Sequence, residues 1–210
     1  MRPILLVGGA PRLAIDAVRY LSVRASGATA LALREQLAAL GRDADLLLDP
    51  AAAPGATARR YADRGELEAA LRAWIAAHPQ GVVVLSAAIN DYQVDRVERL
   101  EGGEAVAHLP GDKIPSGADE LVIRLRPADK VIDRLRPEFG LRGPLVAFKY
   151  QAADTVVAAA EALRRRTGAD LVVANSLCAV VQVLVDAQGS TAYPTRSALV
   201  AALAARIAAL

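Results

Sequence analysis

The chain has 210 residues, 54% of them hydrophobic, which suits one large domain with a substantial buried core. Its formal net charge is only +2, with scattered arginines, so we expect no nucleic-acid partner. No apolar run reaches the roughly 18 to 20 residues that span a bilayer, so we expect no membrane partner either. The start of the chain reads as a strand instead of a signal peptide. A single cysteine, Cys178, excludes an internal disulfide and indicates a reducing, cytoplasmic location. Its apolar neighbours predict a buried thiol.

Short aliphatic runs alternate with stretches of helical spacing, which predicts a Rossmann-like α/β fold with a three-layer, mostly parallel sheet and crossover helices. The expected strands are Ile4–Val7, Asp45–Leu48, Val82–Ser86, Leu145–Phe148 and Leu171–Ala174. The expected helices between them are Ala28–Leu40, Glu66–Ala77, Ala128–Leu135 and Ala153–Arg166.

Three stretches break this alternation. Asp91–Ala118 has no sustained period and is expected to be a long loop or flap, a kind of segment that is usually functional or disordered. Glu120–Arg126 alternates like an exposed strand. Val180–Val185 and Thr191–Tyr193 predict a β-hairpin, and an alanine-rich helix follows to the end of the chain. No linker or repeat is evident, so residues 1–210 are expected to form a single nucleotide-binding domain with a flap at about residues 91–118.

The carboxyl ends of parallel strands are where ligands bind in such sheets. Gly8-Gly9 follows the first strand, but a dinucleotide fingerprint needs a third glycine and an acidic residue about 20 positions on, so an NAD site is improbable. Ser26 and Gly27 precede the first helix, where free N–H groups can cradle a phosphate; the alternative is a simple N-cap.

Later strand ends carry further candidates. Ala87 and Ala88 would let a ligand approach the backbone, and Asp91 could orient a hydroxyl or amide, or only favour a turn. Lys113 in the flap could neutralise phosphate charge if the flap closes, although such a lysine is usually just solvated. Phe148 ends the next strand. Asn175 follows the last parallel strand and could read a base edge or hold a loop.

The order of these signals resembles the phosphopantothenoylcysteine synthetase (phosphopantothenate–cysteine ligase) family nearly end to end. Six motifs of that family have counterparts here in the same order. They are the glycine turn, an Arg-Phe/Tyr-(Ile/Leu)-Ser-Asn-Arg-Ser-Ser-Gly segment, and the motifs Ala-Ala-Val-x-Asp-Tyr, Lys-Ile, Gly-Phe-Lys-x-Glu and Asp-x-Ile-Val-Ala-Asn. The counterparts are, in turn, Gly8-Gly9, Arg19 to Gly27, Ala87 to Tyr92, Lys113-Ile114, Ala147 to Gln151 and Asp170 to Asn175.

The resemblance implies a homodimeric ligase that forms an amide from acid and amine substrates, as in coenzyme A biosynthesis, through an acyl-nucleotide made with CTP or ATP and Mg2+. It implies no metal ligand among the protein side chains. Carried over by position, the implied residues fall into three groups: Gly8, Gly9, Ser26, Gly27, Phe148 and Asn175 for the nucleotide; Arg19, Ala87, Ala88 and Asp91 for the acid substrate; and Lys113 with Asp91 for catalysis.

Several positions depart from the family pattern. Val23 replaces an asparagine associated with the second step, Ala25 replaces a serine, Ala28 and Ala30 replace a lysine and a glycine, and Gln151-Ala152 replaces Glu-Thr. Loss of one buried hydrogen-bonding group costs roughly 1 to 3 kcal/mol. The departures predict either a ligase with a divergent substrate or a catalytically impaired nucleotide-binding or regulatory paralogue on the same scaffold.

Overall fold

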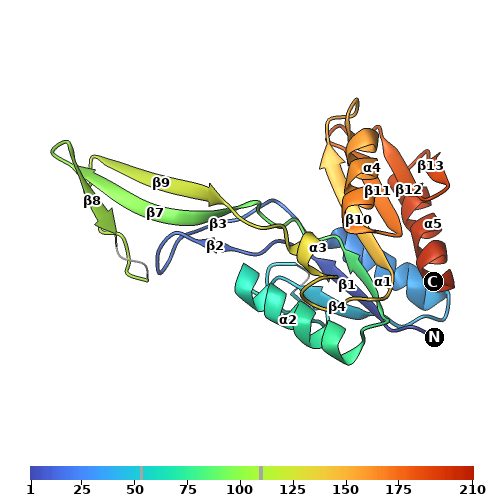
Figure 1. The fold of residues 1–210 in the computed structure, drawn as a ribbon. Helices are drawn as coiled ribbons and strands as arrows, with labels where there is room; N and C mark the ends of the chain where they lie inside the picture. The colour runs from blue at the N-terminus through green and yellow to red at the C-terminus, as the bar shows by residue number, and fades with distance from the viewer. Residues whose placement is uncertain (53, 109–110) are drawn as a thin grey trace.

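The computed structural model describes residues 1–52, 54–108 and 111–210, and an eight-stranded mixed sheet lies at its centre (Figure 1). The two C-terminal strands pair antiparallel and the other neighbours pair parallel. In spatial order the strands are β13 (Gly189–Ala192), β12 (Gln182–Asp186), β11 (Leu171–Ser176), β10 (Leu145–Gln151), β6 (Val82–Leu85), β1 (Ile4–Gly8), β4 (Asp45–Leu48) and β5 (Arg59–Arg60).

Helices cover both faces of this sheet. One apolar cluster joins the sheet to α1 (Ala28–Ala39) and α5 (Arg196–Ala209). A second cluster joins the opposite face to α2 (Arg64–Ala77), α3 (Val131–Arg134) and α4 (Val156–Thr167). The Rossmann-like three-layer fold with its C-terminal hairpin is thereby confirmed. Within the three described ranges, no helix is both long and apolar enough to cross a membrane.

The sheet places its topological switch point at the rim between β1 and β6. From β1 the chain first builds β4 on one side and later returns to build β6 on the other. Both strands are buried along their whole length, as expected for strands covered on two faces. The backbone N–H of Ala88 donates to the Gly9 carbonyl at 2.9 Å, so the segments leaving β1 and β6 stay joined beyond the sheet. Ligands of open α/β sheets bind at such a point.

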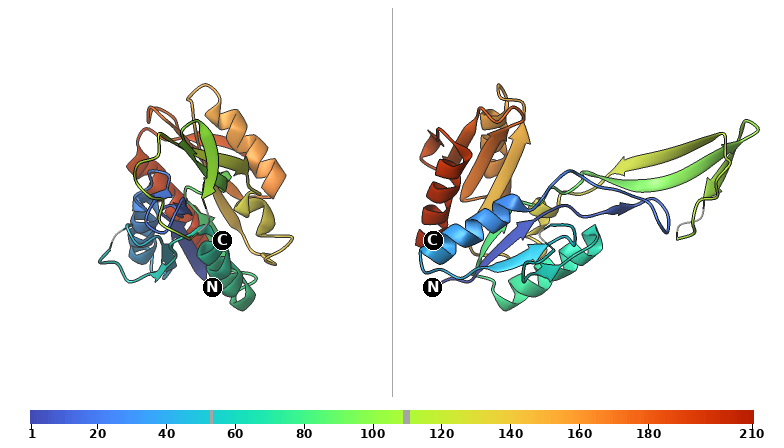
Figure 2. Two further views of the ribbon diagram at one scale, coloured as in Figure 1. Left: turned by 90° about the vertical axis from the view of Figure 1, so that its left-hand side faces the viewer. Right: turned by 180° about the vertical axis from the view of Figure 1, so that it is seen from behind.

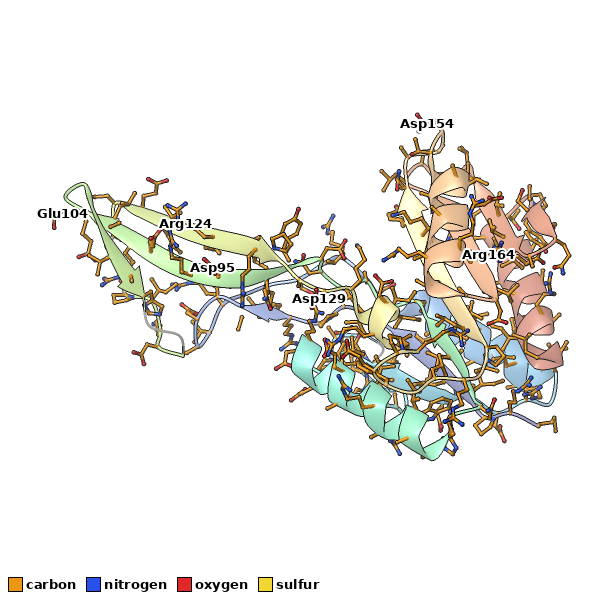
Figure 3. The ribbon with its side chains drawn as sticks, viewed as in Figure 1. Asp95, Glu104, Arg124, Asp129, Asp154 and Arg164 are labelled. Carbon is orange, nitrogen blue, oxygen red and sulfur yellow. The ribbon has the colours of Figure 1, made fainter. Side chains whose placement is uncertain are left out.

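An arm projects from this body, built of β2 (Leu13–Ala14), β3 (Tyr20–Leu21), β7 (Tyr92–Glu101), β8 (Glu104–His108) and β9 (Glu120–Pro127). Figures 1 and 2 show it extending well clear of the three layers. Figure 3 shows Glu104 at its far end, Asp95 and Arg124 along it, and Asp129 where it joins the body. The β2–β3 hairpin lies beside the β7–β9 ribbon near its base.

The segment expected to be a loop therefore forms strands, and a β-bulge explains why its period was hidden. Val94 pairs with Leu125 and Val97 with Ile123, so these apolar residues share one face of the ribbon. Val94 and Val97 are nevertheless three positions apart, because the register shifts between Val94 and Arg96. An extra residue in one strand breaks the two-residue alternation by which strands are recognised.

The helix expected at Ala128–Leu135 was also too long. Only Val131–Arg134 is helical, with Lys130 as its extended N-cap. The N–H of Ala128 instead donates to the carbonyl of Asp91 at 2.8 Å, where the two long strands of the arm meet the body. The first residue of the expected helix is therefore hydrogen-bonded to the base of the arm instead of being helical.

Candidate functional site

The glycine turn after β1 is held by two side chains that sequence reasoning missed, Asp49 and Tyr61. Gly9 has φ 88°, a left-handed conformation that favours glycine. Asp49 is buried directly behind it and accepts a hydrogen bond from the N–H of Ala10 at 3.2 Å. The fully buried hydroxyl of Tyr61 donates to the Gly8 carbonyl at 2.8 Å. Burial, with the nearby Asp49 carboxylate, raises the pKa of Tyr61, so the hydroxyl remains a donor.

A first cavity of about 370 Å³ opens in front of this turn. Four of the residues predicted for the nucleotide, Gly9, Ser26, Gly27 and Asn175, line it together. They come from the ends of β1 and β11 and from the start of α1, which are far apart in the chain. Gly8 lies immediately behind, where an added Cβ would meet the Cα of Gly27 at 3.3 Å.

The first cavity has a positive character that suits an anion. Gly27, the N-cap of α1, has φ 70° and no side-chain cap, so N–H groups of the first turn face the opening. Ser26 Oγ lies 3.4 Å from the N–H of Ala28, a weak version of the expected cap. Two arginines that were not singled out, Arg24 and Arg196, also line the cavity.

Two polar side chains line the same cavity with an oxygen that has no partner among the described residues. They are Asn175, through Oδ1, and Gln182, through Oε1. Gln182 is only 7% exposed. No sequence signal singled it out, because a glutamine in an alternating hairpin strand usually faces solvent.

A second cavity of about 280 Å³ lies beside the first. Ala88 and Tyr150 line both cavities, so the two are neighbours on the rim. The remaining rim residues predicted for the site line the second cavity: Ala87, Ala88, Asp91 and Phe148. Three cationic side chains line it as well: Lys130, Lys149 and Arg166. Phe148 therefore lies with the residues predicted for the acid substrate and not beside Asn175.

Asp91 does not stand alone in the second cavity. Its carboxylate accepts from the ammonium of Lys130 at 2.7 Å. Both side chains are close to half exposed, so the pair contributes little to stability. The ion pair instead fixes the orientation of the Asp91 carboxylate in the second cavity.

Arg19 and Lys113 lie on the arm and line neither cavity of this chain. The buried carboxylate of Asp16 joins them: it accepts from the Arg19 guanidinium at 2.5 Å and from the N–H of Ile114 at 3.0 Å. Burial alone would raise the pKa of Asp16, but the N–H groups of Val18, Ile114 and Arg19 and the Arg19 charge outweigh it and lower the pKa to about 2. Arg19 and the segment carrying Lys113 thus form one structural unit.

The departures from the family pattern cluster around the first cavity. Ala25 and Ala28 line it. Ala30 is fully buried, and its Cβ lies where a side chain on Gly8 would have to go. Val23 precedes the cavity segment and is 41% exposed.

The prediction of a buried thiol was wrong. Cys178 is exposed, in a loop between β11 and β12 where Leu177 and Val180 are also exposed. The Ser176 hydroxyl, 3.4 Å from the sulfur, lowers the pKa of the thiol. Apolar neighbours in sequence predicted burial, but Leu177 and Val180 are themselves exposed at this rim and do not cover the thiol.

Comparison with known proteins decides the family. Residues 1–193 match the family described as "DNA/pantothenate metabolism flavoprotein C-terminal domain". The chain belongs to this family. The resemblance to phosphopantothenoylcysteine synthetases drawn from the motifs is confirmed.

Two curated proteins that are similar to this chain are longer than the chain itself. It is 30% identical over 179 residues to the coenzyme A biosynthesis bifunctional protein CoaBC of Thermococcus kodakarensis, covering 83% of this chain and 41% of that protein. It is 27% identical over 165 residues to a cysteine/cysteine sulfinic acid decarboxylase of an unknown prokaryotic organism, covering 78% of this chain and 42% of that protein. The chain thus spans about two fifths of the length of these relatives.

Solved structures share the fold of this family member. The DNA/pantothenate metabolism flavoprotein from Streptococcus pneumoniae superposes with a TM-score of 0.85 at 22% identity, over 100% of this chain and 99% of that one. A Cab2 mutant in complex with phosphopantothenate-cysteine superposes with a TM-score of 0.78 at 14% identity, over 99% of this chain and 85% of that one. At these identities the likeness concerns the fold alone.

Proposed function

We propose that this protein is a nucleotide-dependent acid–amine ligase that forms an amide through an acyl-nucleotide, on phosphopantothenate and cysteine or on a related pair. One observation carries the proposal: segments distant in the chain meet at the switch point to form a cationic cavity beside a second one. The family match over residues 1–193 supports it. The names of the coenzyme A protein and of the Cab2 complex agree with this chemistry.

The proposed reaction has two displacements. A carboxylate oxygen of the acid attacks the α-phosphorus of CTP or ATP, the bond to pyrophosphate breaks, and an acyl-nucleotide forms. The amine nitrogen then attacks the acyl carbon and loses a proton, and the nucleoside monophosphate leaves. A carboxylate is a poor electrophile until its oxygen becomes part of such a leaving group, so the protein acts chiefly by positioning and charge neutralisation.

In this reading the first cavity binds the triphosphate. Gly9, Gly27 and the first-turn N–H groups of α1 would contact phosphate oxygens, and Arg24 and Arg196 would balance their charge. Magnesium, when bound with the triphosphate, would neutralise further phosphate charge. Within the described residues no cluster of His, Cys, Asp or Glu side chains is placed to hold that ion, so it would enter bound to the nucleotide.

The second cavity would take the remaining parts of the substrates. Ala87 and Ala88 leave room against the backbone, Phe148 offers an apolar wall to the nucleoside, and Asp91 would orient a polar group of the acid. The shared lining residues Ala88 and Tyr150 place the two cavities side by side, as in-line attack of the acid on the triphosphate requires.

We further propose a cytoplasmic homodimer in which the arm of one copy completes the site of the other. The support is that Arg19 and Lys113 lie on the arm and outside both cavities of their own chain. The Asp16 carboxylate ties their segments together, so both cations would enter a partner's site as one unit.

The test is pyrophosphate release with CTP or ATP in Mg2+, using 4′-phosphopantothenate and a panel of related acids. We expect release with at least one pair, and its loss in Lys113→Met. Arg165→Met, which removes an exposed cation that lines neither cavity, serves as the control. No release with any nucleotide and acid would refute the ligase.

A second candidate is a paralogue that binds nucleotide without turnover, and Val23 favours it. An asparagine there would offer a donor and an acceptor at a half-exposed position beside the cavity segment, and valine offers neither. Tight CTP or ATP binding without pyrophosphate release would establish this candidate. If Val23→Asn gains amide product with cysteine, the missing asparagine is what prevents the second step, and the rest of the ligase site is intact.

A further inference from the structure

Tyr150 is an aromatic side chain placed where the two cavities meet. It lies near the end of β10, and it lines both the first and the second cavity. The residue is 66% exposed, although an aromatic ring gains most when it is covered. A large ring left open at the mouth of a cavity is a surface that a ligand can cover.

Two contacts fix the position of this ring. Tyr150 pairs with Asn175 in the parallel register of β10 and β11, and Asn175 lines the first cavity. The Tyr150 hydroxyl also donates a weak hydrogen bond of 3.4 Å to the carbonyl of Leu177, in the loop after β11. Because the hydroxyl is engaged there, the part of Tyr150 that remains for a ligand is its ring.

The neighbouring rim is also apolar. Leu177 and Val180, in the loop to which the Tyr150 hydroxyl is bonded, are exposed, and Ala179 of the same loop lines the first cavity. Phe148 lies two positions before Tyr150, so the two rings project from the same side of β10. Phe148 lines the second cavity. The boundary between the cavities therefore has an aromatic and aliphatic surface.

The first cavity also has a cationic part, and the combination narrows the class of ligand. Arg24, Arg196 and the N-terminus of α1 favour an anion there. A ligand that reaches from these cations to the ring of Tyr150 needs a charged portion and a flat apolar portion. A nucleoside triphosphate has both, whereas an inorganic phosphate lacks the second.

The amides at the back of the first cavity do not compete for the amino group of a base. The side-chain oxygens of Asn175 and Gln182 are enclosed and have no partner among the described residues. Oxygens that water does not reach cannot accept a hydrogen bond from the amino group of cytosine or adenine. Stacking instead uses the face of the base, which every nucleobase has.

We propose that the ring of Tyr150 stacks on the nucleobase of the triphosphate, so that the site accepts purine and pyrimidine nucleotides alike. The inference rests on the proposed function and adds to it a residue that determines nucleotide specificity. The larger face of adenine makes a larger contact with the ring than cytosine does, so ATP depends on Tyr150 at least as strongly as CTP.

The test compares nucleotides with inorganic tripolyphosphate, which has the charge but no base. Calorimetry gives the dissociation constants of CTP, ATP and tripolyphosphate in Mg2+. We expect Tyr150→Leu to weaken CTP and ATP about 10-fold, within the range that base–aromatic stacking contributes, and to leave tripolyphosphate unchanged. Tyr150→Phe keeps the ring and should retain the wild-type affinities. Tyr92→Leu, which removes another exposed ring that lines neither cavity, is the matched control.

A direct readout comes from etheno-ATP, a fluorescent analogue whose base emission is quenched by aromatic stacking. Saturating wild-type protein and Tyr150→Phe should both quench this emission. With saturating Tyr150→Leu the emission should return toward that of the free analogue. Equal quenching by wild type and Tyr150→Leu would overturn the assignment.

The remaining outcomes separate the alternatives. If Tyr150→Leu weakens tripolyphosphate as much as the nucleotides, the side chain shapes the phosphate site and does not stack. If nucleotide affinity is unchanged but the oligomeric mass changes, the exposed ring contacts a second copy of the chain. Either result overturns this inference and leaves the proposed function standing. A wild-type protein that binds no nucleoside triphosphate overturns both.

Discussion

Substitution of Gly9 by alanine tests how the glycine turn is held. Gly9 has φ 88°, and an added Cβ would lie 1.9 Å from Oδ2 of Asp49. The left-handed conformation costs an alanine about 1–2 kcal/mol. Asp49 would also have to move away from the N–H of Ala10, and loss of a hydrogen bond to a charged group costs about 1.5–3 kcal/mol. We expect Gly9→Ala to lower the free energy of unfolding by about 3–5 kcal/mol.

Gly41→Ala is a matched control for this prediction. Gly41 has φ 70°, but an added Cβ meets nothing within 4 Å. It therefore reports the conformational cost alone, about 1–2 kcal/mol. Urea unfolding of both variants without nucleotide measures the difference. Equal destabilisation of the two would refute the claim that Asp49 is fixed behind the turn.

Other consequences concern the supports of the site. Because the folded-state pKa of Asp16 is about 2, below its ordinary value of 3.8, its stabilising contribution is present above pH 4 and is lost as the pH falls through 2. In Asp16→Asn the free energy of unfolding should therefore change less between pH 4 and pH 2 than in the wild type, as urea unfolding at each pH would measure. Tyr61→Phe removes the 2.8 Å bond to Gly8 and should cost about 1–2 kcal/mol in thermal unfolding, and no change would contradict that role. Ser176→Ala should raise the pKa of Cys178 and slow its alkylation by iodoacetamide at neutral pH, whereas a rate as fast as wild type would dismiss the hydroxyl as the cause.

Local pattern was sufficient for most of the body. The buried strand Asp45–Leu48 was predicted with its observed bounds, and the helix observed at Ala28–Ala39 was predicted one residue too long. A fully buried aliphatic run bounded by turns, or a run with helical spacing, carries its own signal. The same reasoning failed for the arm, where a bulge beside Asp95 breaks the alternation. It also failed for Cys178, because burial of a side chain depends on its neighbours in the folded molecule and not on its neighbours in sequence.

The sequence by itself determined the class of fold and the order of the rim motifs, because backbone preference and apolar periodicity are properties of neighbouring residues. Only the tertiary structure decided which motifs share a cavity: Asn175 lies with Gly27, whereas Phe148 lies with Asp91, and Lys113 lies on an arm outside both. It also brought Gln182 opposite Asn175, a strand register that depends on long-range pairing. Contacts between distant segments leave no periodic trace in the chain, and for that reason the enclosed amide pair could be found only in the folded molecule.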